Sequence, residues 1–240
     1  MKWLLKRIPG VITAYRHATF LRWTIREKWF EDRQRMNDDS HLRREWNFES
    51  PAEQERHELM LEAIARHQPE MSQAQVLELG CSDGVFTARI AQCCASVTAC
   101  DISPVARKLA VQRCHRFTNV AFLELDLARD TIPGQYQYDV VFAMDILEFI
   151  HGRNHLQAVV RRLANALRPG GLLAVSSCRL PAELRNAWWM RWLPEGGDAI
   201  AKLIAAEPAL RMVHCEVHPR DGFHIEGYID HVIAVYRKGE

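Results

Sequence analysis

Apolar residues gather in short runs along residues 75–240, and segments with helix or turn signals separate these runs. The first run, 75–79, alternates polar and apolar residues and predicts a strand. The later apolar runs predict six further strands, at 97–101, 120–123, 138–143, 172–176, 211–217 and 231–236. Strands that alternate with helical sequence are typical of an α/β fold built on an open sheet.

Two helix starts carry the side-chain signals of an N-cap. Ser50 and Pro51, with Glu53 three residues after the serine, form a capping box and predict a helix from Pro51 to about His67. Ser103 and Pro104 supply a cap and a first-turn proline for a second helix that runs to Arg113.

The turn after the first strand carries the clearest chemical signal. Gly80 and Gly84 open a tight turn, and residues 86–90 continue with helix-compatible sequence. A strand, a glycine turn and a helix in this order present backbone N–H groups to an anionic or nucleotide-like ligand. The G-x-G-x-x-G dinucleotide fingerprint is not matched, because Ser82 and Val85 occupy its second and third glycine positions. A nicotinamide dehydrogenase is therefore disfavoured. If the two glycines are considered alone, an ordinary βα turn without a ligand remains an alternative.

The pattern E-x-G-x-G-x-G fits better, with Glu78, Gly80 and Gly84 in place and Ser82 in the middle position. This stretch resembles motif I of the class I S-adenosylmethionine-dependent methyltransferases. Asp101 ends the second strand, 21 residues after Gly80, where a carboxylate can accept hydrogen bonds from both ribose hydroxyls.

Further positions agree with the same resemblance. Asp126 follows the third strand, where an acid or amide of the family contacts the adenine amine and the next residue, Leu127, lies beside the ring. Residues 144–149 match the motif after the fourth strand, and 167–171 match the turn into the fifth. The resemblance implies a Rossmann-like fold with a seven-stranded, mostly parallel sheet, helices on both faces and a final antiparallel strand. It implies S-adenosyl-L-methionine as cofactor, held by Glu78, Gly80, Cys81, Ser82, Gly84, Asp101, Ile102, Asp126, Leu127 and Met144. Glu78 is expected to brace the turn.

The segment before the first predicted helix resembles one subgroup of these methyltransferases. The order Trp46-Asn47-Phe48, Ser50-Pro51 and Glu53-Gln54 resembles methyltransferases of the nodulation protein S type, which methylate nitrogen of amino sugars. The resemblance spans about residues 45–177. It implies that this segment folds over the methionine end of the cofactor and the substrate, so Trp46 and Phe48 are candidate substrate-binding residues. Packing of the two aromatic side chains in the core is the alternative.

Candidate bases are expected at the carboxyl ends of the fourth and fifth strands, because that edge of an open α/β sheet holds the ligand crevice. This places Asp145, Glu148 and His151 as candidate catalytic residues, and Arg179 as a candidate substrate-binding residue. A helix cap or salt bridge is the alternative role for Glu148. Many relatives that methylate hydroxyls carry Glu-His where this chain has Glu148-Phe149, so a nitrogen acceptor is preferred over an oxygen acceptor.

Histidine pairs do not indicate a metal site. His151 and His155, and likewise His214 and His218, are four residues apart and could each share a helix face. Neither pair has the glutamate of an H-E-x-x-H motif or an evident third ligand, so no metal is expected.

Charge divides the chain unevenly. Residues 1–30 hold seven Lys and Arg but one acid, interleaved with Trp, Tyr and Phe, whereas the whole chain has a net charge of +1. We predict a helical N-terminal appendage over 1–44 and a methyltransferase domain over 45–240, with an aromatic lid-like segment at about 181–208. The appendage is expected to pack on the protein or a subunit interface, compatible with a homodimer. Contact with an anionic membrane surface is the alternative, and nucleic acid is disfavoured.

Seven cysteines without C-x-x-C pairs indicate a reducing, cytoplasmic compartment. The sequence therefore predicts an S-adenosylmethionine-dependent methyltransferase that acts on nitrogen or oxygen of a small-molecule or sugar acceptor. Two alternatives stay open: a membrane-surface methyltransferase of a lipid-linked acceptor, and a non-catalytic scaffold that keeps the cofactor fold.

Overall fold

A computed structural model describes residues 49–150, 152–179, 197–218 and 230–239. The predicted appendage, Trp46, Phe48 and His151 lie outside these residues, as does the aromatic stretch 188–194. The backbone of Arg179 is described at the end of a strand, but its side chain is not.

The seven predicted strands form one sheet in the order β3-β2-β1-β4-β5-β7-β6. Their bounds are β1 (Gln75–Leu79), β2 (Ser96–Asp101), β3 (Val120–Glu124), β4 (Tyr138–Met144), β5 (Leu167–Arg179), β6 (Leu210–His218) and β7 (Asp230–Lys238). The pairs from β3 to β5 are parallel, and β7 runs antiparallel to both β5 and β6. The predicted mostly parallel sheet with a final antiparallel strand is confirmed.

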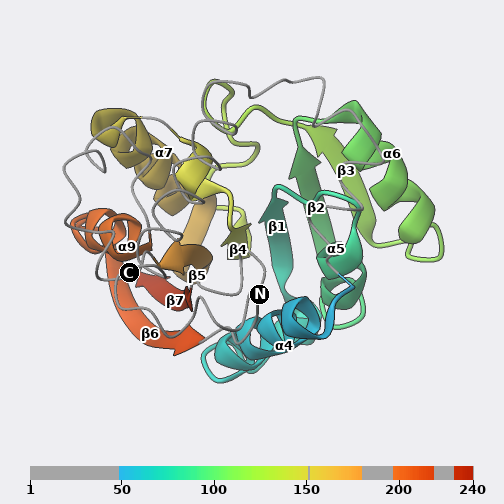
Figure 1. Ribbon diagram of the computed structural model, residues 1–240, viewed down its shortest axis with the longest axis horizontal. Coiled ribbons are helices and arrows are strands. Elements are labelled where there is room, and N and C mark those ends of the chain that lie inside the picture. The colour runs from blue at the N-terminus through green and yellow to red at the C-terminus, as the bar shows by residue number, and fades with distance from the viewer. Residues whose placement is uncertain (1–48, 151, 180–196, 219–229, 240) are drawn as a thin grey trace, which may run out of the picture.

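Helices cover both faces of this sheet (Figure 1). Those described are α4 (Pro51–Ala65), α5 (Val85–Ile90), α6 (Pro104–Arg113), α7 (Arg153–Ala166) and α9 (Gly197–Ala205), with short 3-10 turns η1 (Met71–Gln73) and η2 (Leu147–Phe149). Along β4, Val141 and Ala143 face the apolar cluster that includes α7 and α9, whereas Val140 and Phe142 face the cluster that includes α4 and α5. Because successive side chains of a strand point to opposite faces, this doubly buried strand is apolar throughout.

The predicted helix starts are confirmed by their caps. The Ser50 side chain accepts a hydrogen bond from the Glu53 N–H at 3.4 Å, and the Ser103 side chain accepts one from the Ala106 N–H at 3.2 Å. Helix α4 ends at Ala65, two residues before the predicted end.

One strand starts earlier than predicted, and one helix was not predicted as a separate element. β5 begins at Leu167 rather than at 172, because Leu167 pairs with Tyr138 before a register shift to the Val140–Leu172 pair. Helix α9 lies within the segment predicted as lid-like, and its Ile200, Leu203 and Ile204 are buried in the core.

Candidate cofactor and acceptor site

The candidate residues meet at the carboxyl edge of the parallel strands. β1 lies between β2 and β4, so the strand order reverses at β1. In open α/β sheets a ligand binds beyond the carboxyl ends of the strands at such a reversal. The turn after β1, Asp101 at the end of β2 and Asp145 after β4 all lie at this point.

The turn after β1 is built from residues in the left-handed region. Gly80 and Gly84 have φ values of 71° and 82°, and Ser82 adopts 47°. The N–H groups of Gly80 and Cys81 both donate to the Cys100 carbonyl of β2, at 2.8 and 2.9 Å. The Cys81 side chain is buried in the core, so only its backbone is directed to the site.

Gly84 also meets a steric limit, since a Cβ atom there would lie 2.8 Å from Cα of Ala110 in α6. We expect Gly84→Ala to destabilise the fold by about 1–3 kcal/mol, through overpacking and the positive φ. Urea unfolding measures this. Gly170→Ala is the matched control, because Gly170 has a similar φ of 77° but nothing within 4 Å of the added Cβ. Equal losses in both variants would show that the contact with α6 contributes nothing.

Glu78 stabilises this turn from the buried end of β1. Its Oε2 accepts a hydrogen bond of 2.6 Å from the Thr87 hydroxyl, which ties β1 to α5. Burial raises the pKa of Glu78 to about 8, against the opposing effect of the Thr87 hydrogen bond. The side chain is 4% exposed, so it supports the turn rather than presenting a group to a ligand.

Asp101 presents a carboxylate at the end of β2. Its Oδ2 accepts the Ser82 N–H at 2.9 Å and its Oδ1 accepts the Ser103 N–H at 2.8 Å. Burial raises the pKa of Asp101, while these two backbone hydrogen bonds oppose the shift. Each carboxylate oxygen has a second lone pair, so the group can still accept hydrogen bonds from two neighbouring hydroxyls. The adjacent Ile102 is 36% exposed and offers an apolar surface beside it.

The predicted adenine-side residues lie in the turn after β3. Oδ1 of Asp126 accepts the Ala128 N–H at 3.0 Å, which fixes the side chain within its own turn. Leu127 packs in the core cluster and is 7% exposed, and its carbonyl accepts Arg162 Nη2 at 2.8 Å. Met144, at the end of β4, packs against the cluster on the opposite face.

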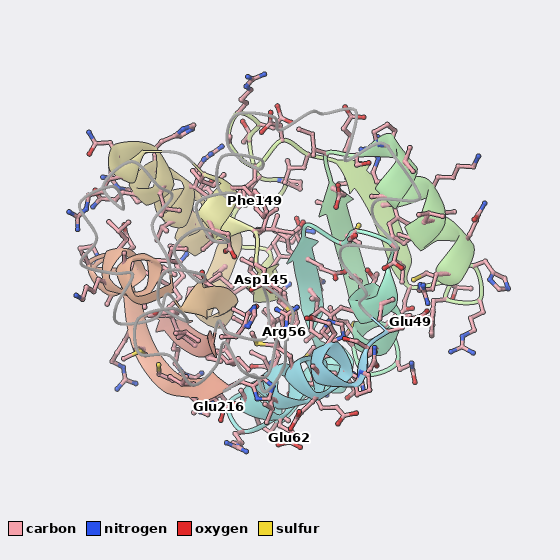
Figure 2. The ribbon with its side chains drawn as sticks, in the orientation of Figure 1. Glu49, Arg56, Glu62, Asp145, Phe149 and Glu216 are labelled. Atoms are coloured by element: carbon pink, nitrogen blue, oxygen red, sulfur yellow. The ribbon has the colours of Figure 1, made fainter. Side chains whose placement is uncertain are left out.

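Asp145 lies inside a network of charged side chains. Arg56 Nη1 of α4 donates to its Oδ2, and the Ser176 hydroxyl donates to its Oδ1 at 2.9 Å. Figure 2 shows Arg56 and Asp145 together where α4 meets the end of β4. His231 Nε2 of β7 lies 3.4 Å from Oδ2. The Arg56 guanidinium and His231 hold the pKa of Asp145 well below its usual range, although burial alone would raise it.

Glu148 has a different environment three residues further on. Its Oε2 accepts a hydrogen bond from the Ser177 hydroxyl at 3.2 Å. Loss of solvation raises the pKa of Glu148 to about 8, and the neighbouring Asp145 anion adds to the shift. One carboxyl group of the pair is thus held as an anion and the other is protonated near neutral pH.

Two further arginines connect the start of α4 to other helices. Arg89 of α5 contacts α4 itself, and Arg113 of α6 contacts Glu49, the residue before the Ser50 cap. Arg113 of α6 binds Oε1 of Glu49 at 2.8 Å and Oδ2 of Asp83 at 2.9 Å. Arg89 of α5 donates to the Gln54 carbonyl at 3.0 Å and to Glu58 at 2.8 Å. The described start of the predicted substrate-covering segment therefore lies against the turn after β1.

Sequence reasoning missed Arg56, Ser176 and His231. Arg56 follows Glu53 by three residues on one helix, which predicts a local ion pair and gives no signal of the contact with Asp145. The sequence predicts a strand that contains His231 but no role for this residue, since no spacing connects it to residues 145–148.

Only the second histidine pair can be compared with the expected helix face, because His151 lies outside the described residues. His214 and His218 lie on strand β6 and not on a helix. His155 lies on α7 with Nε2 2.7 Å from the Ala128 carbonyl. Among the described residues, no group of three His, Cys, Asp or Glu side chains could hold a metal ion.

The model of the family "Nodulation protein S (NodS)" matches residues 30–215. The chain belongs to the NodS family. The predicted resemblance to the class I S-adenosylmethionine-dependent methyltransferases is thereby confirmed.

The similar proteins include a nodulation protein S and an O-methyltransferase. Nodulation protein S of Bradyrhizobium diazoefficiens is 26% identical over 144 residues, which cover 60% of this chain and 66% of that protein. A ubiquinone biosynthesis O-methyltransferase of Xanthomonas euvesicatoria is 33% identical over 53% of this chain and 55% of its own length. The aligned part thus spans about half to two thirds of these relatives.

A solved structure shares the fold. The N-methyltransferase NodS of Bradyrhizobium japonicum WM9, in complex with S-adenosyl-L-homocysteine, superposes with a TM-score of 0.69 at 22% identity. The match covers 86% of this chain and 96% of that chain. Across the described part of the molecule, no helix is long and apolar enough to cross a membrane.

Proposed function

We propose that this protein is an S-adenosylmethionine-dependent methyltransferase that methylates nitrogen or oxygen of a small-molecule or sugar acceptor, with nitrogen preferred. The observation that carries the proposal is the Asp101 carboxylate, oriented by two backbone N–H groups beside a glycine turn at the strand-order reversal. NodS family membership and the S-adenosyl-L-homocysteine in the NodS structure support it.

The residues present fit this cofactor. Asp101 can accept hydrogen bonds from both ribose hydroxyls, and Gly84 lets the turn after β1 pack against α6, where a Cβ atom would clash with Ala110. Ile102 and Met144 offer apolar surface, and Asp126 remains the proposed adenine contact, with Leu127 supporting it from the core. When bound, S-adenosylmethionine supplies an electrophilic methyl group on a sulfonium sulfur.

The chain's own contribution to the transfer is alignment, exclusion of water and control of a proton. Asp145 follows β4 and Glu148 lies in η2, and the Glu148 carboxyl group can form a hydrogen bond that orients a nitrogen of the acceptor. Phe149, in place of the histidine of many hydroxyl-methylating relatives, favours an amine. His151, Trp46, Phe48 and Arg179 stay proposed as further acceptor-side residues.

The whole-chain organisation is part of the same proposal. A helical appendage over 1–44 would precede the methyltransferase domain, contributing to packing, to a homodimer contact or to binding at a membrane surface. The cysteines at 81, 93, 94, 100, 114 and 215 are free thiols. Thiols of this kind support a reducing cytoplasmic compartment, where disulfides are rare.

Calorimetric titration with S-adenosylmethionine, S-adenosylhomocysteine and NAD tests the cofactor. We expect Asp101→Ala to weaken binding of S-adenosylhomocysteine by about 10- to 100-fold, because it removes charge-assisted hydrogen bonds to two hydroxyls. Glu124→Ala is the control, since Glu124 pairs with Asp101 in the sheet register but is exposed. Binding of NAD alone, or unchanged affinity in a folded Asp101 variant, would refute the assignment.

The acceptor class is tested by turnover. Amino sugars and simple amines are compared with phenols and sugar hydroxyls by following release of S-adenosylhomocysteine. Activity with amines only is the expected result, and activity confined to hydroxyl acceptors would overturn the preference for nitrogen.

A further inference from the structure

Arg56 is an unusual residue to find in the core, because it is 3% exposed and bridges two carboxylates. On one side its Nε donates to Oε2 of Glu53 at 3.0 Å, within helix α4. On the other side Nη1 reaches Asp145 and the Ser176 hydroxyl, the latter at 2.8 Å. A buried arginine keeps its charge only where such partners surround its guanidinium.

This arrangement makes Asp145 a fixed anion. Both of its oxygens are engaged, by Ser176 on one and by Arg56 with His231 on the other. Its backbone is fixed as well, since its N–H donates to the Ser176 carbonyl at 2.9 Å and its φ is 49°. A non-glycine residue in the left-handed region is held there by its surroundings, and such residues cluster at functional sites.

Glu148 differs from Asp145 in its protonation, because its surroundings favour the neutral carboxyl group. Its carboxyl group accepts a hydrogen bond from the Ser177 hydroxyl, and the charges of both Asp145 and Arg56 act on it. His231 of β7 approaches Asp145, with Nε2 3.4 Å from Oδ2, and Lys202 of α9 is exposed. Loss of solvation is the main reason why the ionised form of Glu148 is disfavoured; the Asp145 anion adds to this effect, and the Arg56 guanidinium opposes it. Of these causes, the Asp145 charge is the one that a substitution can remove.

We propose that Arg56 is a positioning residue for methyl transfer: it docks α4 on the carboxyl edge of the sheet and fixes Asp145 as an anion, so that Glu148 alone of the two exchanges a proton with the acceptor. This inference rests on the proposed methyltransferase function. In the carboxylate form, Glu148 accepts one proton from the acceptor nitrogen and then releases it to water, while Arg56 and Asp145 keep their charges.

The full chain, labelled with 13C at its Asp and Glu carboxyl carbons, tests this assignment without an acceptor. NMR spectra are recorded from pH 5 to 9 with S-adenosylhomocysteine absent and present, and Glu148→Gln and Asp145→Asn assign the two signals. We expect the Glu148 signal to titrate in this range and the Asp145 signal to stay at the ionised position. Asp145→Asn should lower the Glu148 midpoint by about one pH unit or more, because the repelling anion is lost.

Arg56 is tested by two substitutions of different charge. In Arg56→Met the Asp145 signal should begin to titrate between pH 5 and 9, whereas Arg56→Lys should keep Asp145 ionised. If Arg56→Met does not fold, the Arg56→Lys and Asp145→Asn spectra still decide the assignment. The amine that gives turnover then supplies a kcat/KM–pH profile, in which Asp145→Asn should move the same midpoint.

Three results would overturn the proposal: Glu148 ionised throughout the range, a Glu148 midpoint unchanged in Asp145→Asn, or an Asp145 signal that titrates together with Glu148 in the unsubstituted protein. Calorimetry with S-adenosylhomocysteine separates this failure from failure of the methyltransferase assignment. Retained binding with any of these three results would leave the proposed function standing and remove only the role of Arg56.

Discussion

Replacing Arg56 with methionine is expected to lower the free energy of unfolding by about 3–5 kcal/mol, the loss typical of removing one partner from a buried ion pair. The methylene stem would be kept, so the packing volume changes little. The loss arises because Asp145 and Glu53 no longer have the guanidinium that compensates their burial. Urea unfolding of the full chain at pH 7 measures it.

Arg66→Met, at the C-cap of the same helix, is the matched control, because the Arg66 side chain is 57% exposed and should contribute almost nothing. The double variant Arg56→Met/Asp145→Asn should recover part of the loss, since it leaves no unpaired anion at residue 145. A loss that is the same for Arg56 and Arg66, or a double variant whose losses simply add, would contradict the ion-pair account.

Stability should fall as the pH rises from 6.5 to 8. Glu78 and Glu148 have a usual pKa of 4.5 that is raised to about 8 in the fold, so the folded protein binds more protons than the unfolded chain between these values. The stabilisation is complete below pH 4.5 and is lost as the pH rises through 8. Over 6.5 to 8, two such groups correspond to a fall of about 2–4 kcal/mol.

The buried His57 limits the pH range in which this fall in stability can be measured. Burial lowers the pKa of His57 from 6.5 to about 3, so the unfolded chain binds the extra proton between these values and stability rises with pH there. At pH 6.5 half of the unfolded chains still carry this proton, so the opposing effect fades over about one further pH unit and reduces the fall only slightly. Urea unfolding at pH 6.5 and 8 should show the fall, and Glu78→Gln and Glu148→Gln should each remove about half of it.

Glu62→Gln provides the comparison for the pH effect, since Glu62 is an exposed glutamate of α4. Stability that is flat or rising between pH 6.5 and 8 in the unsubstituted protein would show that these two carboxyl groups are ionised in the fold.

Local sequence signals were sufficient for the part of the site built from one short stretch of chain. Gly80, Gly84 and Glu78 lie within seven residues, and the φ values and the Thr87 contact are consequences of that local order. Asp101 could be predicted because a parallel sheet brings the ends of β1 and β2 together. Capping serines marked the starts of α4 and α6 for the same local reason.

The contacts on the proposed acceptor side could not be predicted in this way. The contact between Arg56 and Asp145 joins residues 89 positions apart, and His231 comes from yet another strand. Asp145 was selected by its place after β4, but its left-handed backbone and its engagement by three side chains depend on tertiary packing. Spacing can select the carboxyl groups of a site, whereas their protonation is decided by neighbours that are distant in sequence.

The position of β7 has a consequence for how the molecule is assembled. β7 lies between β5 and β6, and β6 precedes it in the chain, so β6 has no place on the sheet until β7 is present. His231 arrives on that same strand. During synthesis, the turn after β1 and the Asp101 carboxylate can therefore form early, while the surroundings of Asp145 are completed last. A nascent chain would form the proposed cofactor-binding half before the proposed acceptor half.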